Sequence, residues 1–190
     1  MTTRTSVFKL RESSETIPEL PADVKALPSL PKTRSGKLAH EKISQGYAAF
    51  LSDADDKSPF WDSYADGAII YFAGNMKNLS RYPKDAKLFW AVFYSVVTHG
   101  LEEVISNPII DLLVWDNGYA FATSHNSYRA YSGKSWKGAS LNRMKYDESG
   151  RIYDQAFFYE DLAAMDSLVG ELFDLPSVQN DVFEKLGIRL

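Results

Sequence analysis

Apolar side chains in the first hundred residues recur at the three- and four-residue spacing of an amphipathic helix. One such stripe lies within residues 37–52 and consists of Ile43, Tyr47, Phe50 and Leu51. A second and more apolar stripe follows Pro83 and precedes Gly100, a residue type that suits a helix end. We therefore predict helices over 37–52 and 83–99, with a short helix at 60–64 and a strand at 68–72 between them.

After residue 100 the pattern changes to the two-residue alternation of strands, whose successive side chains point to opposite faces of a sheet. Turns such as Asp116-Asn117-Gly118 separate four runs of this kind, at 101–115, 119–131, 137–146 and 151–159. These runs predict an antiparallel meander, with a bulge or an edge position where Pro108 interrupts the first strand. Two helices are expected after it, over 161–173 and 177–186.

Helices followed by a long meander predict an α+β fold, in which a curved sheet wraps round the helices and encloses an apolar, cone-shaped pocket. Four of the eight prolines fall between Ile17 and Pro31, so residues 1–36 are expected to form an extended arm. The domain is then predicted over 37–170 and a C-terminal helical tail over 171–190. Deleting residues 1–34 is expected to leave the domain folded and to alter ligand affinity or oligomeric state.

Composition narrows the classes of partner. Of the 190 residues 45% are apolar and 14% aromatic, which suits either a bulky core or a cavity walled by rings. The net charge of −4 comes without a basic cluster, so no nucleic-acid partner is expected. The absence of cysteine excludes thiol nucleophiles and thiolate metal sites. Because no apolar run has the length of a spanning helix or signal peptide, we expect no membrane partner and a cytoplasmic location.

Three short motifs resemble the SnoaL-like branch of the nuclear-transport-factor-2-like (NTF2-like) superfamily. They are Tyr64-Ala65-Asp66-Gly67-Ala68 ahead of the first strand, Gly150-Arg151-Ile152 at the last strand, and the following Phe158-Tyr159-Glu160-Asp161-Leu162. Their order and spacing carry the resemblance, which covers about residues 38–170. It implies a cone-shaped α+β barrel around a pocket for a small ring-containing molecule, such as a polyketide, a terpenoid or a steroid.

Within that superfamily the segment 128–136 is similar to one that follows the catalytic strand of limonene epoxide hydrolases. Those enzymes use an Asp-Arg-Asp set, and the matching positions here hold Ser124, Asn126 and Phe157, so water activation of that kind is not expected. Matched to ketosteroid isomerases, the oxyanion-hole acid falls near Asn142, the phenol near Tyr47 and the general base near Phe72.

Scytalone dehydratases supply a third match. Ser140-Leu141-Asn142 reproduces their Ser-x-Asn, and Tyr71 stands for a substrate-orienting tyrosine. Their catalytic histidines are not clearly placed, since His99 comes too early and His125 matches only if a bulge shifts its strand.

One face of the strand over 119–131 must line the predicted pocket. We favour the even positions, which are small and polar in the middle of the strand, and this leaves His125 and the other odd positions for a dimer interface. With the neighbouring strands, the even face predicts a ring of amides and hydroxyls from Ser124, Asn126, Tyr128, Ser140, Asn142, Tyr153, Gln155 and Tyr159. Such groups either orient a ligand oxygen or simply satisfy one another as buried polar residues.

A group that transfers protons is sought among His40, His125, Asp111 and Asp154, because an apolar cavity can shift the pKa of an imidazole or carboxyl toward neutrality. Asp111 is either a buried base opposite Asn126 or a solvated outward residue, since the sequence leaves the hairpin register open. The three histidines have no metal-ligand spacing, so we expect neither a metal nor another cofactor.

Three functions remain in view. In the first, a cofactor-independent isomerase, cyclase or dehydratase, Tyr47, Asn126 and Asn142 hold the substrate oxygen and His125 or Asp111 moves the proton. The ring of that substrate would pack on Phe72, Phe89, Phe93 and Phe157. The second is a non-catalytic binding domain for a small hydrophobic ligand, because the acid-base positions of the related enzymes hold Phe, Ser and Asn here. The third is an assembly module, a homodimer through the open sheet face around Phe121 and Tyr131.

Overall fold

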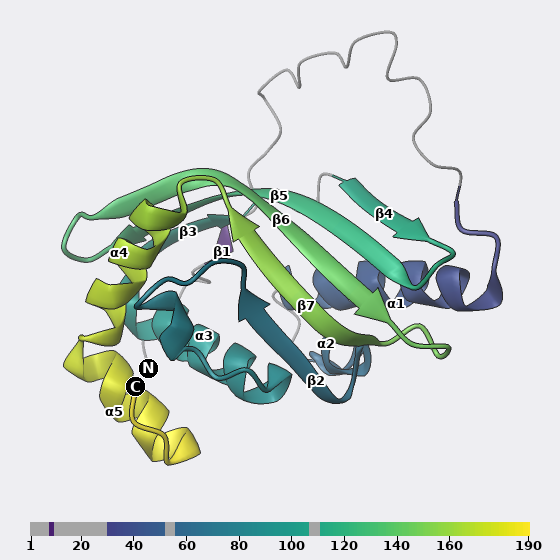
Figure 1. The fold of residues 1–190 in the computed structure, drawn as a ribbon. Helices are drawn as coiled ribbons and strands as arrows, with labels where there is room; N and C mark the ends of the chain where they lie inside the picture. Colours follow the sequence, from purple (N-terminus) through teal and green to yellow (C-terminus); the bar gives the residue numbers. More distant parts are fainter. Residues whose placement is uncertain (1–7, 10–29, 52–55, 107–110) are drawn as a thin grey trace, which may run out of the picture.

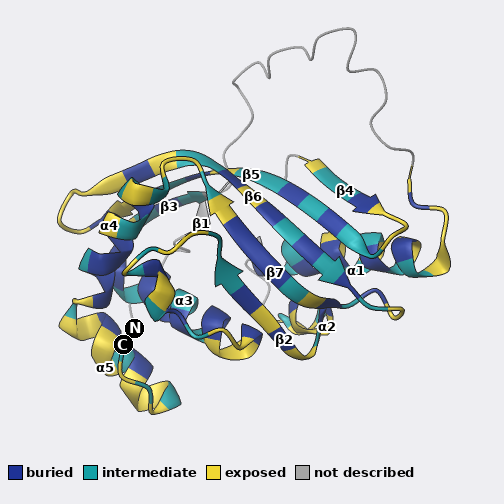
Figure 2. Ribbon diagram, viewed as in Figure 1, coloured by how far each residue is buried: buried dark blue, intermediate teal, exposed yellow. Residues whose placement is uncertain are grey.

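A strongly curled mixed sheet with helices on its concave side forms an α+β half-barrel in the computed structural model of the chain (Figure 1). The model describes residues 8–9, 30–51, 56–106 and 111–190. The expected fold class is confirmed, and the buried side chains gather where helices cover the concave face (Figure 2). No helix of the described residues is long and apolar enough to cross a membrane.

The sheet has the strand order β1-β3-β5-β6-β7-β2, and β4 also pairs with β5. The strands are β1 Phe8–Lys9, β2 Tyr64–Phe72, β3 Leu101–Ser106, β4 Asp111–Trp115, β5 Tyr119–Ala130, β6 Ser135–Tyr146 and β7 Ile152–Tyr159. From β3 to β7 the pairing is antiparallel, as the alternation predicts, whereas β1 and β2 run parallel to their partners β3 and β7.

The strand predicted over 101–115 is two strands, and this corrects the expected single run. β3 pairs with the second half of β5, where Val104 lies opposite Tyr128, and β4 pairs with the first half, where Val114 lies opposite Ala120. Pro108, at which a bulge or an edge is expected, lies outside the described residues.

The helices are α1 Arg34–Leu51, α2 Ser58–Asp62, α3 Ala86–Gly100, α4 Leu162–Phe173 and α5 Pro176–Leu186, with a 3₁₀ turn, η1, at Leu79–Arg81. α3 begins later than predicted because Asp85, and not Pro83, marks its start. The Asp85 carboxylate accepts a hydrogen bond from the Leu88 backbone N–H at 3.0 Å, which satisfies a donor that the first turn leaves free.

Two turns of the sheet hold the beginning of α1. The Asp116 carboxylate, in the β4–β5 turn, accepts hydrogen bonds from the Thr33 backbone N–H at 2.9 Å and from its hydroxyl at 2.7 Å. In the β6–β7 turn, Gly150 has a φ of 77°, and a Cβ there would stand 2.5 Å from the Ala39 nitrogen. Glycine is therefore required at this close approach.

At the other end of the molecule α5 packs along α3. The Ser95 hydroxyl donates to the Asp181 carboxylate at 2.6 Å, and the His99 Nε2 lies 3.2 Å from the same carboxylate. Lys185, one turn further along α5, also contacts it at 2.9 Å. This buried corner holds the predicted C-terminal tail against the domain.

Candidate functional site

The even positions of β5 face the concave side of the sheet. Asn126 and Tyr128 are buried, while His125 and Arg129 are exposed on the convex side. The reason is the two-residue period of the strand, since α1 and α3 cover one face only.

A chain of hydrogen bonds crosses the interior from α3 to α1. The Trp90 Nε1 donates to the Tyr64 hydroxyl at 3.1 Å, and that hydroxyl donates to the Gln155 Oε1 at 2.7 Å. The Gln155 Nε2 donates to the Tyr47 hydroxyl oxygen at 3.1 Å and to the Asn142 Oδ1 at 3.4 Å. We call these five residues the neutral network. Gln155, at its centre, is 0% exposed.

The network carries no charge at neutral pH. Burial raises the pKa of Tyr47 to about 12, although the hydrogen bond from Gln155 lowers it somewhat. Burial, and then the proximity of Tyr47, raise the pKa of Tyr64 well above its usual value. Both phenols therefore keep their protons. Within the described part of the chain nothing accepts the Tyr47 hydroxyl proton or a hydrogen from the Asn142 amide nitrogen, so the network ends on two free donors.

A second polar group lies nearby on β5 and β6. The Ser124 and Ser140 hydroxyls are 2.7 Å apart, and the Asn126 Nδ2 donates to both, at 3.0 and 3.2 Å. The predicted ring of amides and hydroxyls is thus divided into the neutral network and this cluster. Here the polar groups bond to one another, which is the alternative that the sequence left open.

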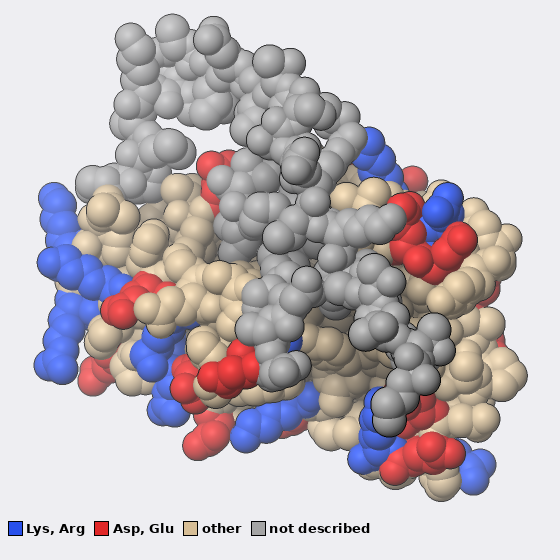
Figure 3. Space-filling model, turned by 180° about the vertical axis from the view of Figure 1, so that it is seen from behind, with Lys and Arg blue, Asp and Glu red and all other residues tan. Residues whose placement is uncertain are grey.

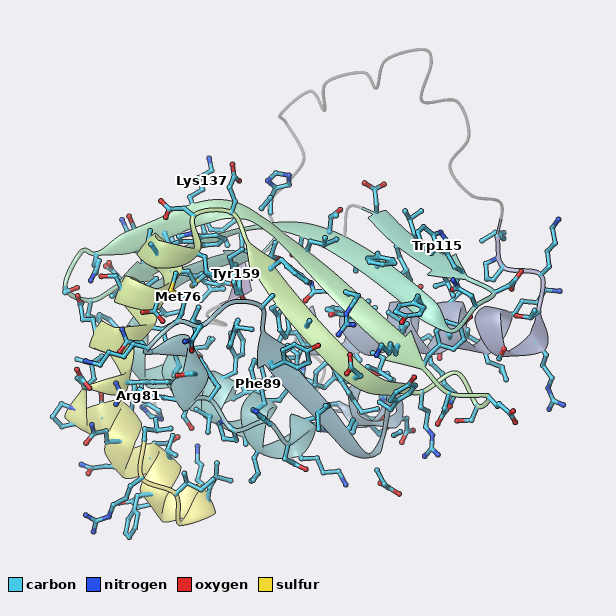
Figure 4. All side chains as sticks on the ribbon, viewed as in Figure 1. Met76, Arg81, Phe89, Trp115, Lys137 and Tyr159 are labelled. Atoms are coloured by element: carbon cyan, nitrogen blue, oxygen red, sulfur yellow. The ribbon has the colours of Figure 1, made fainter. Side chains whose placement is uncertain are left out.

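Aromatic rings pack against one another in the interior beneath the sheet. The ring centroids of Phe72, Phe89 and Phe157 are 5.6 to 5.7 Å apart, and the rings of Phe89 and Phe157 are stacked with nearly parallel planes, at 6°. Figure 4 shows Phe89 from α3 in the space beneath the sheet. Between these rings and α4 lies a cavity of about 30 Å³ lined by described residues, which admits a water-sized group and no ring.

That cavity is bounded by apolar side chains and three tyrosines. The lining residues are Phe72, Leu79, Tyr82, Phe93, Val96, Leu101, Tyr128, Tyr159, Met165, Leu168, Val169 and Leu172. Phe93 and Tyr128 are therefore in the interior, as predicted. Tyr64, Trp90 and Tyr82 are interior residues that the sequence reasoning did not place at the site. Tyr153, which the alternation placed in the polar ring, is instead 45% exposed.

Three predicted site residues lie on the convex side, away from the neutral network. His125 and Asp111 are exposed there. Asp111 pairs with Thr123, an odd position of β5, so the alternative that puts it opposite Asn126 is wrong. The Tyr71 hydroxyl accepts a hydrogen bond from Arg143, which also pairs with Asp154. The structure thus separates the candidate acid-base groups from the oxygen-binding groups, and of the described residues no three His, Cys, Asp or Glu gather as metal ligands.

Charged side chains of both signs share the surface of the described residues. On the face seen in Figure 3, acidic and basic residues are interspersed and leave areas of uncharged surface between them. None of the polar side chains buried in the described residues is charged; they are Ser63, Ser95, Asn126, Ser140, Asn142 and Gln155.

No protein-family model matches the sequence, and no curated protein matches it. Solved structures do match in fold. An NTF2-like protein of unknown function from Burkholderia pseudomallei K96243 is 14% identical, with a TM-score of 0.54 over 70% of this chain and 97% of that one. A steroid delta-isomerase from Pseudomonas aeruginosa is 15% identical, with a TM-score of 0.51 over 84% of this chain and 100% of that one.

TerC, co-crystallised with polyporic acid, is 11% identical, with a TM-score of 0.52 over 70% of this chain and 98% of that one. The chain therefore has the NTF2-like cone fold that its motifs indicated. At these identities the likeness concerns the fold.

Proposed function

From the NTF2-like cone fold, we propose that this chain binds one small, mostly apolar, ring-containing molecule and holds it through an oxygen atom. The observation that carries the proposal is the neutral network, which ends on the free hydroxyl proton of Tyr47 and the free amide of Asn142. A carbonyl or hydroxyl oxygen accepts from both donors, whereas a hydrocarbon leaves them unsatisfied.

The network holds these donors in place before a ligand arrives. Gln155 bonds to both of them, and Tyr64 with Trp90 holds Gln155 from the other side. Groups fixed in this way lose little freedom on binding, which favours affinity and selects for the position of the oxygen.

A ring that enters the apolar layer around Phe72 must displace side chains there, because the cavity that Phe72 lines is only about 30 Å³. Phe72 is the side chain that we expect to move. It is the last residue of β2, it is only partly buried, and its ring contacts Tyr82, Phe89, Phe157 and Tyr159. If Phe72 swings outward, a ligand ring takes its place between Phe89 and Phe157.

An isomerase, cyclase or dehydratase activity is the second candidate, and the same pair of donors favours it. Tyr47 and Asn142 are arranged to stabilise negative charge that develops on a carbonyl oxygen. The proton, however, needs an acceptor, and the buried polar side chains of the described residues are uncharged. Binding without turnover is therefore the function that this interior supports best.

The test compares tetralin, 2-tetralol and 2-tetralone, which share one skeleton and differ in the oxygen. We expect both oxygenated compounds to bind about tenfold more tightly than tetralin in isothermal titration calorimetry. Tyr47→Phe should remove most of that difference, while Tyr71→Phe, on the convex side, should not change it. Equal affinities for the three compounds, or equal losses in the two variants, would contradict the proposal.

Turnover is measured on the same ketone. In deuterium oxide an enzyme of the proposed kind accelerates exchange of the hydrogens next to the carbonyl of 2-tetralone, which mass spectrometry follows. Exchange at the rate of buffer supports binding alone, and acceleration that Tyr47→Phe abolishes supports catalysis.

We also propose that two copies pair through the convex side of the sheet. Trp115, Leu141 and Phe158 are 43%, 37% and 41% exposed there, and the Trp115 and Phe121 ring centroids are 5.1 Å apart. Figure 4 shows Trp115 on this side, away from the interior. Light scattering should give a dimer that Leu141→Lys dissociates, and a monomer at all concentrations would contradict the proposal.

A further inference from the structure

The connection between β2 and α3 forms one wall of the interior. Its residues 74–82, which we call the η1 segment, lie against α4, and Figure 4 labels Met76 and Arg81 on it. Leu79, at the start of η1, is 2% exposed and lines the cavity of about 30 Å³ together with Tyr82. From α4 the same cavity is lined by Met165, Leu168, Val169 and Leu172. The seam between the η1 segment and α4 therefore closes the cavity on this side.

One carboxylate joins the two sides of this seam. Asp166 of α4 accepts hydrogen bonds from the backbone N–H groups of Asn78 and Leu79, both at 2.8 Å, and from the Asn78 Nδ2 at 3.1 Å. A Cβ on Gly170 would stand 2.5 Å from the same Nδ2, so α4 has a glycine where the η1 segment is seated. Hydrogen bonds to a charged acceptor are stronger than those between neutral groups. Asp166 thus ties the η1 segment to α4.

The two ends of the η1 segment are fixed to the sheet. Before it, the Ala73 N–H donates to the Phe157 carbonyl at 2.8 Å. After it, the Lys84 carbonyl accepts from the Ile70 N–H at 2.7 Å. Gly74 follows the first of these anchors with a φ of 108°, in a region of backbone conformation that glycine enters and leaves at little cost. The segment can therefore lift from α4 as a loop while both of its ends stay in place.

Little else of a polar kind holds the η1 segment down. Within the described part of the chain, one further residue outside the segment hydrogen-bonds to it, namely Asp174, which accepts from Arg81 at 3.1 Å. The Asp174 side chain is 71% exposed, and an ion pair so open to solvent contributes little. The Arg81 guanidinium also lies over the Phe173 ring, 4.9 Å from its centroid. The bonds of Asp166 are therefore the main polar tie across the seam.

α4 itself is held in place from its other side. In the β5–β6 turn, the Lys134 Nζ donates to the Ser167 carbonyl at 3.0 Å and to its hydroxyl oxygen at 2.8 Å. Leu168 and Phe173 are 1% and 0% exposed and belong to the core. The η1 segment is therefore the side of the seam that can move.

We propose that the seam between the η1 segment and α4 is the entrance to the interior, and that Asp166 holds it closed. This rests on the proposed function and adds to it the route by which the ligand arrives. When the η1 segment lifts, Leu79 leaves the cavity and the apolar layer around Phe72 opens to solvent. Closing restores the three bonds of Asp166 whether the interior is empty or filled. Asp166 should therefore set the rates of entry and release and not the affinity.

The first experiment measures opening without a ligand. Because the chain has no cysteine, Leu79→Cys gives it a single thiol, which reacts with 5,5′-dithiobis(2-nitrobenzoate) when the segment lifts. We expect Asp166→Asn to raise the rate of this reaction about tenfold, since an amide carries no charge and offers fewer acceptor sites. Asp174→Asn is the same change at the exposed ion pair, and as the matched control it should alter the rate less than about twofold.

A second thiol position separates local opening from unfolding of the whole chain. Val92 of α3 is 0% exposed and does not line the cavity, so Val92→Cys should react at least about tenfold more slowly than Leu79→Cys. Hydrogen exchange of the unmodified chain gives a reading that needs no variant, because peptides within 74–82 should exchange faster than peptides of α3. Equal rates in either comparison would show that the interior opens only by unfolding, and would overturn the proposal.

The second experiment follows the entry of 2-tetralone by stopped-flow tryptophan fluorescence. Asp166→Asn should raise the association and dissociation rate constants alike, by about tenfold, and leave Kd within about twofold of the wild type. Asp174→Asn should change neither rate. Circular dichroism checks that each variant is folded.

The outcomes separate the entrance from the proposed function. If 2-tetralone binds but Asp166→Asn leaves both rates as they are, or changes Kd instead of the rates, this inference fails and the proposed function stands. If 2-tetralone binds neither the wild type nor Asp166→Asn, the proposed function fails and the entrance fails with it.

Discussion

The Gln155 Nε2 donates to the Tyr47 hydroxyl oxygen at 3.1 Å, which ties the last strand of the sheet to the first helix. The two residues are 108 positions apart, so the bond forms only when the half-barrel closes on α1. The same side chain serves Tyr64 and Asn142, and the network is therefore as much a part of the fold as of the site.

Replacing Gln155 by leucine should destabilise the protein by about 3 kcal/mol. The variant leaves the Tyr64 proton and the Asn142 oxygen without partners in a buried place, at roughly 1 to 3 kcal/mol for each unsatisfied group. Urea denaturation checks the value. A loss below about 1 kcal/mol would mean that water or neighbouring groups replace the missing bonds.

Removing a tyrosine hydroxyl should have opposite effects at the two ends of the interior. Tyr64→Phe deletes a hydroxyl that accepts from Trp90 and donates to Gln155, and should cost about 1 to 2 kcal/mol. Tyr82→Phe deletes the hydroxyl of a residue that is 7% exposed, and this hydroxyl has no hydrogen-bond partner among the described residues, so the change should be neutral or stabilising by up to about 1 kcal/mol. Thermal unfolding of both variants compares them directly, and a Tyr82→Phe variant as unstable as Tyr64→Phe would show that its hydroxyl has a partner.

Gly150→Ala should destabilise the protein by about 2 kcal/mol or more. Alanine at a φ of 77° is strained, and its Cβ would also press on the backbone of Leu38 and Ala39. Gly67→Ala is the matched control, because Gly67 has a φ of 71° with no atom within 4 Å of a Cβ there. It should cost only about 1 kcal/mol. Equal losses would indicate that α1 yields to the extra atom.

The contacts of Asp181 between α3 and α5 should make the free energy of unfolding depend on pH in the acid range. Burial acts to raise the pKa of Asp181, but hydrogen bonds from Ser95 and Lys185 and the nearby His99 outweigh it and hold the pKa below its usual value. A carboxyl with a lowered pKa stabilises the fold above its unfolded pKa of about 4, and this contribution is lost as the pH falls through the folded value.

Asp181→Asn should therefore cost about 1 to 2 kcal/mol at pH 7, and the difference from the wild type should shrink as the pH falls below the unfolded pKa of about 4. Denaturant unfolding over a series of pH values measures it. A difference that does not change with pH would assign the loss to packing of α5 instead of to the carboxylate.

Removing residues 1–34 should lower stability by about 1 to 3 kcal/mol, although the sequence alone predicts an unaffected fold. The reason is that Lys32 and Thr33 hydrogen-bond to Asp116 and fix the start of α1. Asp116→Ala should reproduce most of the loss in the full chain. If the truncated chain melts with the wild type, these bonds contribute nothing to stability.

Much of the fold follows from the sequence because periodicity reports which side of an element is buried. The alternation over 119–131 places Asn126 and Tyr128 inside, as the structure has them. The division into β3 and β4 was not predictable in this way, because two strands that pair with the same partner keep the alternation of one.

The candidate site was harder to predict, for two physical reasons. The face of Asp111 depends on hairpin register, although counting back from the pair Trp115 and Tyr119 across the turn would have placed it opposite Thr123. Whether rings fill a cavity or wall it depends on their rotamers, and neither composition nor spacing reports rotamers. The aromatic residues Phe72, Phe89 and Phe157 are in the interior, where their rings pack against one another.

The fluorescence of Trp90 and Trp136 reports on the interior. Trp90 hydrogen-bonds to Tyr64 in the neutral network, and Trp136 stacks on Tyr128 where β5 and β6 pair, so each indole adjoins a different part of the interior. Trp61 and Trp115 are exposed, and acrylamide quenches such indoles selectively. With Trp136→Phe or Trp90→Phe, the emission that resists quenching comes from one part alone, and a guest molecule can be followed as it arrives there without any added dye.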